Sequence, residues 1–319
     1  MLENRSRVAE SPLMAAPNLL IDCDPGHDDV LAIVTAAAYA NVVGITTVAG
    51  NAALEHTTRN ALVTAELTGL YRPVYAGASG PLAGDTRDAT HVHGDAGLAG
   101  VVVPEPSTRP AGDDAPGFIV EQAHAIDDLW IVAVGPLTNI AHALERAPTL
   151  ATTVAGISIM GGGPFGNATP AAEFNIWADP EAADVVFRSG ARIRMCGLDL
   201  THQVCADAAF VATLFAFGTP LGDFTGALLS HYRARIIELT GEDLAALHDP
   251  CAVLAVTHPE CLGFGRHSVR VECDGKYTRG MTVIDRRRDT TGAVEVAWHA
   301  DAARALELIA QAVASASTS

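Results

Sequence analysis

The chain has 319 residues, of which 49% are hydrophobic and 18% are charged, and its formal net charge is −17. This apolar content is sufficient for a large folded core and excludes a disordered protein. The negative charge repels polyanions, so we expect no nucleic-acid partner.

The N-terminal segment, residues 1–17, combines charged and small residues without the apolar core of a secretory signal, and we interpret it as a loose tail. We expect the folded domain to cover residues 18–319. The uncharged stretch 30–54 is long, but Asn41 and Gly44 interrupt it, which favours a helix and a buried strand over a membrane span. Six cysteines without a CxxC pair predict reduced thiols in a cytoplasmic protein.

Short apolar runs alternate with helical patterns along the first part of the chain. Residues 18–21 form a predicted strand that leads into a predicted helix over 28–40, with acidic residues in its first turn. The same pattern recurs at 42–48 with 55–70, at 129–134 with 137–146, and at 156–160 with 179–188. Repeated strand–helix units predict a mainly parallel sheet covered by helices on both faces.

The second part of the chain adds a predicted strand at 192–198 and a segment rich in helix formers at 206–247. Further strands are predicted at 268–271, 281–284 and 294–298, before a final helix over 301–314. Because no repeat or linker is visible, we predict a single Rossmann-like α/β domain, with a mainly parallel central sheet flanked by helices and a helical elaboration near 206–247. Such sheets bind ligands beyond the carboxyl ends of their strands.

Four aspartates, Asp22, Asp24, Asp28 and Asp29, lie together where the first predicted strand passes into the first helix. Carboxylates this close repel one another, and the helix dipole offsets only part of the repulsion. A hard cation that prefers oxygen ligands, such as Ca²⁺ or Mg²⁺, would relieve it. One such aspartate is more often a helix cap than a ligand, but four around a Pro-Gly turn favour a metal site.

A second polar motif is His248-Asp249-Pro250, which follows the helical segment. Asp249 is a candidate to complete a metal site. It is also the residue type that caps a helix when proline follows at the first helical position. His248 taken alone is more often structural than catalytic.

A third motif, Met160-Gly161-Gly162-Gly163, leaves a predicted strand and precedes Asn167 and Glu173-Phe174-Asn175. It lacks the Gly-Lys-Ser/Thr ending of a phosphate loop, so its glycines favour close approach to a neutral, hydroxyl-rich ligand. Asn and Glu side chains suit sugar hydroxyls as donors and acceptors. Three weaker signals are Asn51, residues 91–94 and residues 134–139. Taken separately, each is typical of an ordinary turn, and a functional role is favoured only if they meet at one sheet edge.

Together these segments resemble the calcium-dependent inosine-uridine-preferring nucleoside hydrolases. The resemblance rests, in chain order, on Asp-Cys-Asp-Pro-Gly-His-Asp-Asp at 22–29, Thr-Thr-Val-Ala-Gly-Asn at 46–51, Met-Gly-Gly-Gly at 160–163, Ala-Glu-Phe-Asn at 172–175 and His-Asp-Pro at 248–250. It implies an enzyme that hydrolyses the N-glycosidic bond of a ribonucleoside to ribose and free base in purine and pyrimidine salvage. It also implies a homodimer or homotetramer.

The resemblance further implies the roles of individual residues. Asp24, Asp29, Asp249 and the backbone carbonyl of Val134 would bind Ca²⁺, with Asp22 close by, and Asp24 would also be the general base toward water. The implied substrate-binding residues are Asp28, Asn51, His93, Met160, Asn167, Glu173, Phe174, Asn175 and Tyr232. His248 would protonate the leaving base, and carboxylates near the ring would stabilise the positive charge that develops on the sugar.

The base-binding part of the site departs from the family pattern. Relatives often have two tyrosines on the helix before His-Asp-Pro, whereas this chain has Tyr232 and, near the second position, Ile236. The sequence therefore leaves the preferred base open. One alternative function is a haloacid-dehalogenase-like Mg²⁺ phosphatase, with Asp22 as nucleophile and the single lysine, Lys276, binding phosphate. Another is a catalytically silent nucleoside-binding protein.

Overall fold

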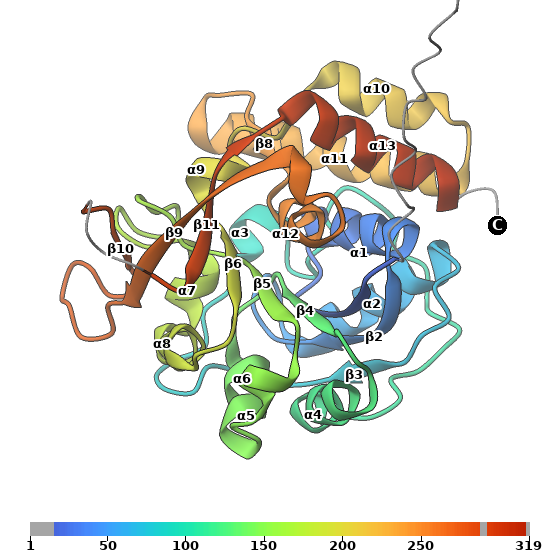
Figure 1. The fold of residues 1–319 in the computed structure, drawn as a ribbon. Helices are drawn as coiled ribbons and strands as arrows, with labels where there is room; N and C mark the ends of the chain where they lie inside the picture. Colours follow the sequence, from blue (N-terminus) through green and yellow to red (C-terminus); the bar gives the residue numbers. More distant parts are fainter. Residues whose placement is uncertain (1–15, 288–291, 317–319) are drawn as a thin grey trace, which may run out of the picture.

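The fold is a mostly parallel sheet between two layers of helices (Figure 1). The computed structural model describes residues 16–287 and 292–316, so the predicted N-terminal tail lies outside the described residues apart from Ala16 and Pro17. The strands of the large sheet are, in spatial order, β10 (Thr282–Asp285), β9 (Leu262–Val271), β11 (Val294–Ala300), β6 (Ile193–Cys196), β5 (Gly156–Met160), β4 (Trp130–Ala133), β1 (Asn18–Cys23), β2 (Asn41–Thr47) and β3 (Val74–Ala76).

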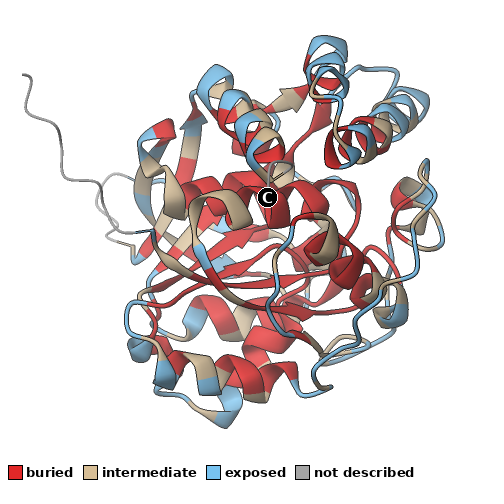
Figure 2. Cartoon of the chain, turned by 90° about the vertical axis from the view of Figure 1, so that its right-hand side faces the viewer, coloured by how far each residue is buried: buried red, intermediate tan, exposed pale blue. Residues whose placement is uncertain are grey.

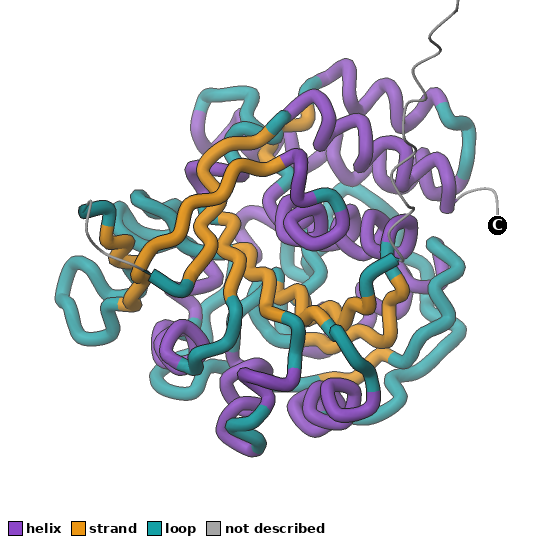
Figure 3. The backbone as a smooth tube through the Cα atoms, in the orientation of Figure 1, coloured by secondary structure: helices purple, strands orange, loops and turns teal. Residues whose placement is uncertain are grey.

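Strand direction agrees with the prediction from the repeated strand–helix units. The strands from β3 to β11 run parallel to their neighbours, and only β9 and β10 add antiparallel pairings at one edge. Figure 3 shows these strands crossing the centre of the molecule with helices around them. The predicted α/β class and mainly parallel sheet are therefore confirmed.

Helices cover both faces of this sheet. One face carries α1 (His27–Tyr39), α2 (Leu54–Leu67) and α12 (His248–Thr257), and the other carries α4 (Ala115–Ala125), α5 (Thr138–Arg146) and α8 (Pro180–Arg188). Side chains of β1 alternate between the two faces. Leu19 and Ile21 pack in the core under α1, α2 and α12, whereas Leu20 packs in the core under α4, α5 and α8. Apolar residues on both sides of each strand explain why the strands are continuous hydrophobic runs.

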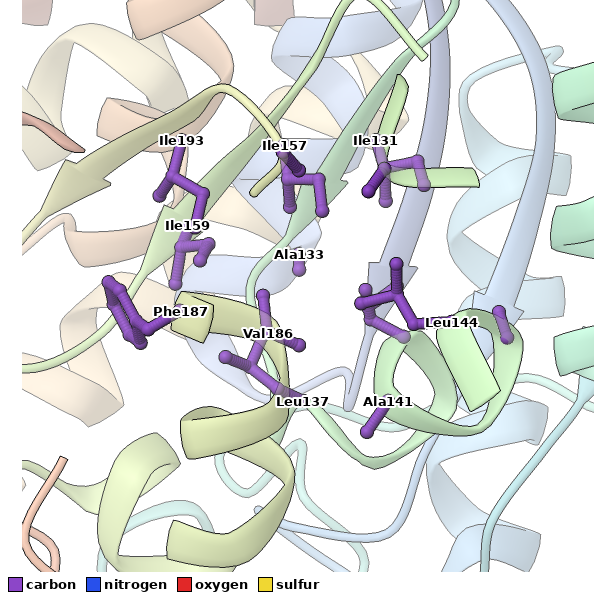
Figure 4. Close-up of a cluster of buried hydrophobic side chains, with 14 of the residues drawn as sticks. Ile131, Ala133, Leu137, Ala141, Leu144, Ile157, Ile159, Val186, Phe187 and Ile193 are labelled. Atoms are coloured by element: carbon purple, nitrogen blue, oxygen red, sulfur yellow. The ribbon is translucent and has the colours of Figure 1, made fainter. Parts of the chain in front are cut away.

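The cluster on the α4, α5 and α8 face is a closely packed aliphatic core. Figure 4 shows Ile131 of β4 and Ile159 of β5 in one cluster with Leu144 of α5 and Val186 of α8. In Figure 2 the sheet and the inward faces of the helices are buried, and exposed residues gather on the outer faces. This rigid core holds the strand ends, and therefore the polar residues that follow them, in fixed positions.

A further helical layer packs over α1 and α12. It consists of α10 (Ala208–Ala216), α11 (Pro220–Thr240) and α13 (Ala302–Ala316), whose apolar sides share one core cluster with α1. The predicted helical elaboration near 206–247 is thus present as two helices, followed by β8 (Ala245–Ala246), which pairs with β7 (Cys205–Ala206). Within the described part of the chain, no helix is both long and apolar enough to cross a membrane.

Several elements were missed or misplaced by the sequence patterns. The missed ones are β3, β7, β8, α4, α12 and the short elements α3 (Thr90–His93), α6 (Leu150–Thr153), α7 (Phe174–Ala178), α9 (Leu198–Thr201) and η1 (Pro259–Cys261). Strand β9 begins at Leu262, not at residue 268 as predicted. Its first half contains Gly263, Gly265 and Arg266 and is partly exposed, so it has no clear apolar alternation and is held by pairing with β11.

The strand order places a topological switch between β1 and β4. From β1 the chain proceeds outward to β2 and β3, whereas β4, β5 and β6 extend the sheet on the other side. Just past the strand ends, the Val134 N–H donates to the Asp22 carbonyl at 2.8 Å, and the Val48 N–H donates to the Cys23 carbonyl at 3.0 Å. Ligands bind at such a crevice in open α/β sheets.

Candidate active site

A cavity of about 720 Å³ opens beyond the carboxyl ends of these strands. The predicted site residues that line it are Asp28, Asn51, His93, Val134, Met160, Asn167, Glu173, Phe174, Asn175, Tyr232, His248 and Asp249. Asp22, Asp24 and Asp29 are fully buried and do not line the cavity. Residues that are far apart in the sequence thus converge on one place.

Three carboxylates form a compact acidic group. Asp28, Asp29 and Asp249 are all buried, and each offers one oxygen that lies within 4.8 Å of those of the other two. Asp28 and Asp29 come from the first turn of α1, and Asp249 comes from the first turn of α12. Because α1 and α12 pack side by side, their two N-termini bring these charges together.

Asp24 lies beside this acidic group, in a space that only glycines leave open. Its Oδ2 accepts a hydrogen bond from the Asn51 N–H at 2.6 Å, whereas its buried Oδ1 has no partner among the described residues. A Cβ on Gly50 would lie 2.1 Å from Asp24 Oδ2, and a Cβ on Gly135 would lie 2.6 Å from Oδ1. Any other residue at either position would therefore displace the carboxylate.

Asp29 is held by hydrogen bonds from the turn that precedes its helix. Its Oδ1 accepts from the Asp24 N–H at 3.2 Å, and its Oδ2 accepts from the Gly26 N–H at 2.9 Å. The Asn51 side-chain amide also donates to Oδ2, at 3.0 Å. These bonds fix the carboxylate as part of the helix N-terminus.

Asp22 is positioned by two neighbours from adjacent elements. Its Oδ1 accepts hydrogen bonds from the Thr46 hydroxyl at 2.6 Å and the Asn139 amide at 2.7 Å, while its buried Oδ2 has no partner among the described residues. Asn139 also accepts from the Ala78 N–H at 2.9 Å. Asn139 was seen in the sequence only as part of a turn.

Burial raises the pKa of every carboxyl group in this cluster. The pKa of Asp22 rises to about 7, and that of Asp28 rises to about 7 because of burial and the charge on Asp29. The pKa values of Asp24 and Asp249 lie well above the ordinary range for the same reasons. These groups are thus costly to ionise unless positive charge is nearby.

The donor set fits a divalent cation that prefers oxygen. Buried carboxylate oxygens on Asp22 and Asp24 lack hydrogen-bond donors, the acidic group lies next to them, and no cysteine thiol lines the cavity. The Val134 carbonyl faces the same region and accepts from the Asn175 amide at 2.9 Å. Carboxylates and a main-chain carbonyl are ligands of Ca²⁺ or Mg²⁺.

The glycine-rich turn after β5 positions the residues expected to bind sugar. Glu173 caps α7 and accepts hydrogen bonds from the N–H groups of Gly162 at 2.9 Å, Asn175 at 2.9 Å and Ile176 at 3.2 Å. Burial raises the pKa of Glu173 to about 7. The exposed Asn167 accepts from the Phe174 N–H at 3.0 Å, so this loop and α7 form one wall of the cavity.

Imidazole and phenol rings form another part of the cavity wall. His248 Nδ1 lies 2.7 Å from the Thr201 hydroxyl, and the His248 ring lies 5.6 Å from that of His202. His93 and Tyr232 have parallel rings with centroids 5.9 Å apart. Burial lowers the pKa of His248 to about 3 and holds that of His93 well below its usual value.

Several lining residues carried no signal in the sequence. They include Asp88, Trp177, Leu239, Thr240, Glu242 and Leu244. The last four belong to the end of α11 and the turn after it, where the sequence has no catalytic motif. Lys276, the phosphate-binding candidate of the phosphatase alternative, does not line the cavity and lies against the Tyr277 ring.

Comparison with known proteins agrees with this geometry. A family model described as inosine-uridine preferring nucleoside hydrolase matches residues 19–307. The pyrimidine-specific ribonucleoside hydrolase RihA of Salmonella typhimurium is 43% identical over 278 residues, which cover 85% of this chain and 89% of RihA.

Solved structures show the same relationship. The purine-preferring ribonucleoside hydrolase from Gardnerella vaginalis is 31% identical with a TM-score of 0.89, and the alignment covers 94% of this chain and 99% of that one. A plant nucleoside hydrolase is 33% identical with a TM-score of 0.86, over 93% of this chain and 99% of that one. The chain therefore belongs to the inosine-uridine preferring nucleoside hydrolase family, enzymes that hydrolyse the N-glycosidic bond of nucleosides.

Proposed function

We propose that this enzyme uses Ca²⁺ bound by Asp24, Asp29, Asp249 and the Val134 carbonyl, with Asp22 behind them. The observation that carries the proposal is the Asp24 carboxylate, which is completely buried and has one oxygen without a donor beside other carboxylates. When bound, the ion supplies positive charge that lowers the pKa of a coordinated water. The same charge removes the repulsion between the buried carboxylates.

Asp24 is the general base in this proposal. Its Oδ2 is fixed by the Asn51 N–H, and its Oδ1 is free to accept a proton from the attacking water. The fixed carboxylate needs no rearrangement before the proton moves.

The sugar is held between α1 and the wall formed by α7. Asp28, Glu173 and Asn175 line the cavity there, together with Asn51, Met160, Asn167 and Phe174. Asp28 is also near enough to Asp29 and Asp249 to contribute an oxygen to the metal, and the resemblance assigns it to the sugar. Carboxylates on this side stabilise the positive charge of an oxocarbenium-like sugar.

The leaving base is placed against the wall of rings formed by His93, Tyr232 and His248. In this proposal His248 donates a proton to the base as a neutral imidazole, since burial lowers its pKa to about 3, and the Thr201 hydroxyl orients its ring through Nδ1. We also propose a preference for pyrimidine ribonucleosides, as in RihA, and a role in nucleoside salvage. Assembly into a homodimer or homotetramer stays a prediction from the resemblance.

The test is release of reducing sugar from uridine, cytidine, inosine, adenosine and guanosine, measured with and without a chelator. We expect turnover of uridine and cytidine that chelator abolishes and that added Ca²⁺ restores. Phosphate release from phosphate esters is the control for the phosphatase alternative. Sugar release that is unchanged after complete removal of divalent metal would contradict the proposed metal role.

A further inference from the structure

The glycine turn at residues 161–163, which follows β5, has no side chains of its own to hold it in place. Gly162 has a φ of +71° and Gly163 a φ of +140°, and both are backbone conformations that favour glycine. Such a segment must be fixed by hydrogen bonds from other parts of the chain. The Gly162 carbonyl accepts from the Leu198 N–H at 2.9 Å, and the Gly162 N–H is the group that donates to Glu173.

Thr282, the first residue of β10, holds the end of this turn. Its hydroxyl accepts a hydrogen bond from the Gly163 N–H at 2.9 Å and donates one to the Gly163 carbonyl at 2.9 Å. Both residues are buried. Within the described part of the chain, no other group bonds to the N–H or the carbonyl of Gly163. Loss of the hydroxyl would therefore leave two buried backbone groups unpaired.

The methyl group of Thr282 also packs against the preceding residue of the turn. A Cβ on Gly162 would lie 2.6 Å from Thr282 Cγ2, so the threonine side chain fills the space that the glycine leaves. Thr282 thus bonds to Gly163 and packs on Gly162, whose N–H donates to Glu173. The direction of this N–H is controlled from β10, although β9, β11 and β6 lie between β10 and β5 in the sheet.

Glu173 receives the Gly162 hydrogen bond at the wall of the cavity. Its Oε2 accepts from the N–H groups of Gly162 and Ile176, and its Oε1 accepts from the Asn175 N–H. Of these three donors, only Gly162 lies outside α7. The Gly162 N–H is therefore the donor that fixes the carboxylate relative to β5. A shift of the turn would move Glu173 with respect to a ligand in the cavity.

We propose that Thr282 is a positioning residue of the active site: its hydroxyl fixes the turn at Gly163 and thereby directs the Glu173 carboxylate toward a hydroxyl group of the sugar. Strand β10, at the edge of the sheet, then contributes to sugar recognition although no motif residue lies on it. Glu173 contacts the ligand, and Thr282 acts only through Glu173. The inference rests on the proposed binding of the sugar by Glu173.

The first experiment compares two substitutions of Thr282 in steady-state kinetics with uridine at saturating Ca²⁺. Thr282→Val keeps the shape and removes the hydroxyl, and we expect a KM about tenfold higher, the usual size of one hydrogen bond. Thr282→Ser keeps the hydroxyl and should restore the wild-type KM. A wild-type KM in Thr282→Val, or an equal rise in Thr282→Ser, overturns the proposal.

Thr64→Val is the matched control for the loss of a buried hydroxyl. Thr64 is fully buried in α2, its hydroxyl donates to the Asn60 carbonyl at 2.8 Å, and it does not line the cavity. Its KM should stay within about twofold of the wild type. A rise equal to that of Thr282→Val would show that the effect is general damage and would overturn the proposal.

The second experiment is a double-mutant cycle between Thr282→Val and Glu173→Gln. If Thr282 acts through Glu173, each single variant raises the KM about tenfold and the double variant raises it about tenfold as well. Independent roles would multiply to about a hundredfold. That result overturns the route through Glu173, because a residue with a separate structural effect adds its loss to any other.

The third experiment observes the Glu173 carboxyl group without substrate. Burial raises the pKa of Glu173 to about 7, and hydrogen bonds from backbone N–H groups, including that of Gly162, partly offset the rise. Spectra of the full-length protein labelled with ¹³C at glutamate carboxyl groups follow the titration, and Glu173→Gln assigns the signal. We expect a higher Glu173 pKa in Thr282→Val than in Thr282→Ser or the wild type, because loss of a donor disfavours the carboxylate.

These measurements separate the inference from the proposed function. An unchanged Glu173 pKa in Thr282→Val overturns the positioning role whether or not the protein hydrolyses nucleosides. A raised pKa with an unchanged KM shows that Glu173 does not bind the substrate, which contradicts its proposed sugar-binding role and overturns the inference built on it. If Thr282→Val does not fold, Thr282→Cys replaces it in all three comparisons, since a thiol forms only weak hydrogen bonds.

Discussion

Asp24 and Asn139 illustrate what can and cannot be recognised residue by residue. Asp24 belongs to a run of aspartates whose mutual repulsion is visible in the sequence, and the structure places it fully buried next to Asn51. Asn139 is 117 residues away from Asp22, yet its amide holds that carboxylate. Nothing in its local sequence distinguishes it from an ordinary turn residue.

The role of Asp24 as base leads to a prediction for Asp24→Asn. The amide oxygen can still accept from the Asn51 N–H, so the fold is retained, but it cannot take a proton from water. We expect kcat for uridine to fall by about 10²–10⁴-fold, as for other general bases. Steady-state kinetics at saturating Ca²⁺ measures this effect.

The matched control is Asp199→Asn, because Asp199 on α9 also has a buried oxygen without a hydrogen-bond partner among the described residues but does not belong to the acidic group or contact Asn51. Its kcat should stay within about twofold of the wild type, since substitutions away from special features have small effects. Equal losses in the two variants would show that the Asp24 effect comes from general damage to the structure.

At the scale of elements, helix N-termini organise the site. The first turns of α1 and α12 supply Asp28, Asp29 and Asp249, and Glu173 caps α7. Each of these positions favours an acidic residue because of the free N–H groups and the helix dipole. The sequence patterns found α1 for this reason, but they missed α7, which is too short to show helical periodicity.

The buried cap of α8 is expected to matter more for stability than an ordinary cap. Asp179 accepts from the Ala182 N–H at 3.0 Å and also from the Leu82 N–H at 2.8 Å and the Thr138 hydroxyl at 2.6 Å. Asp179→Ala leaves these buried donors unpaired. We expect the free energy of unfolding in urea to decrease by about 2–4 kcal/mol.

Asp207→Ala provides the comparison for this prediction. Asp207 is an exposed cap of α10, and its side chain accepts one hydrogen bond, from the Phe210 backbone N–H at 2.7 Å. Its loss should cost about 1 kcal/mol. If both variants lose the same amount, the contacts of Asp179 with Leu82 and Thr138 contribute nothing to stability.

For the whole molecule, the buried carboxylates predict how stability depends on pH once metal is removed. Burial raises the pKa values of Asp22 and Asp28 to about 7, against about 4 in an unfolded chain. Between these values the folded protein binds more protons than the unfolded chain, so its stability falls as the pH rises. We expect the Tm of the chelated protein to decrease by about 5 °C or more between pH 5 and pH 8.

Differential scanning calorimetry in chelator and in excess Ca²⁺ checks this prediction. A bound cation favours the ionised carboxylates, so added Ca²⁺ should raise the Tm at pH 8 much more than at pH 5. Asp28→Asn should show a weaker pH dependence in chelator, because one of the titrating groups is absent. A Tm in chelator that rises from pH 5 to pH 8 would show that these carboxylates do not control stability.

The sequence by itself determined the parts of this protein that depend on neighbouring residues. Strand–helix alternation predicted the parallel sheet, and the crowding of Asp22, Asp24, Asp28 and Asp29 predicted a site at the end of β1. The prediction of the sheet succeeds because hydrophobic periodicity acts over a few residues, and like-charge repulsion between neighbouring aspartates is visible over the same range.

Only the tertiary structure decided which distant residues complete the cavity. The order β3-β2-β1-β4-β5-β6 puts Val134 beside Asp22, and the packing of α12 on α1 brings Asp249 to Asp28. The contact of Thr282 with Gly163 depends in the same way on where β10 lies relative to the turn after β5. Such contacts join residues many tens of positions apart, and they arise from the burial of whole elements against one another rather than from any local pattern.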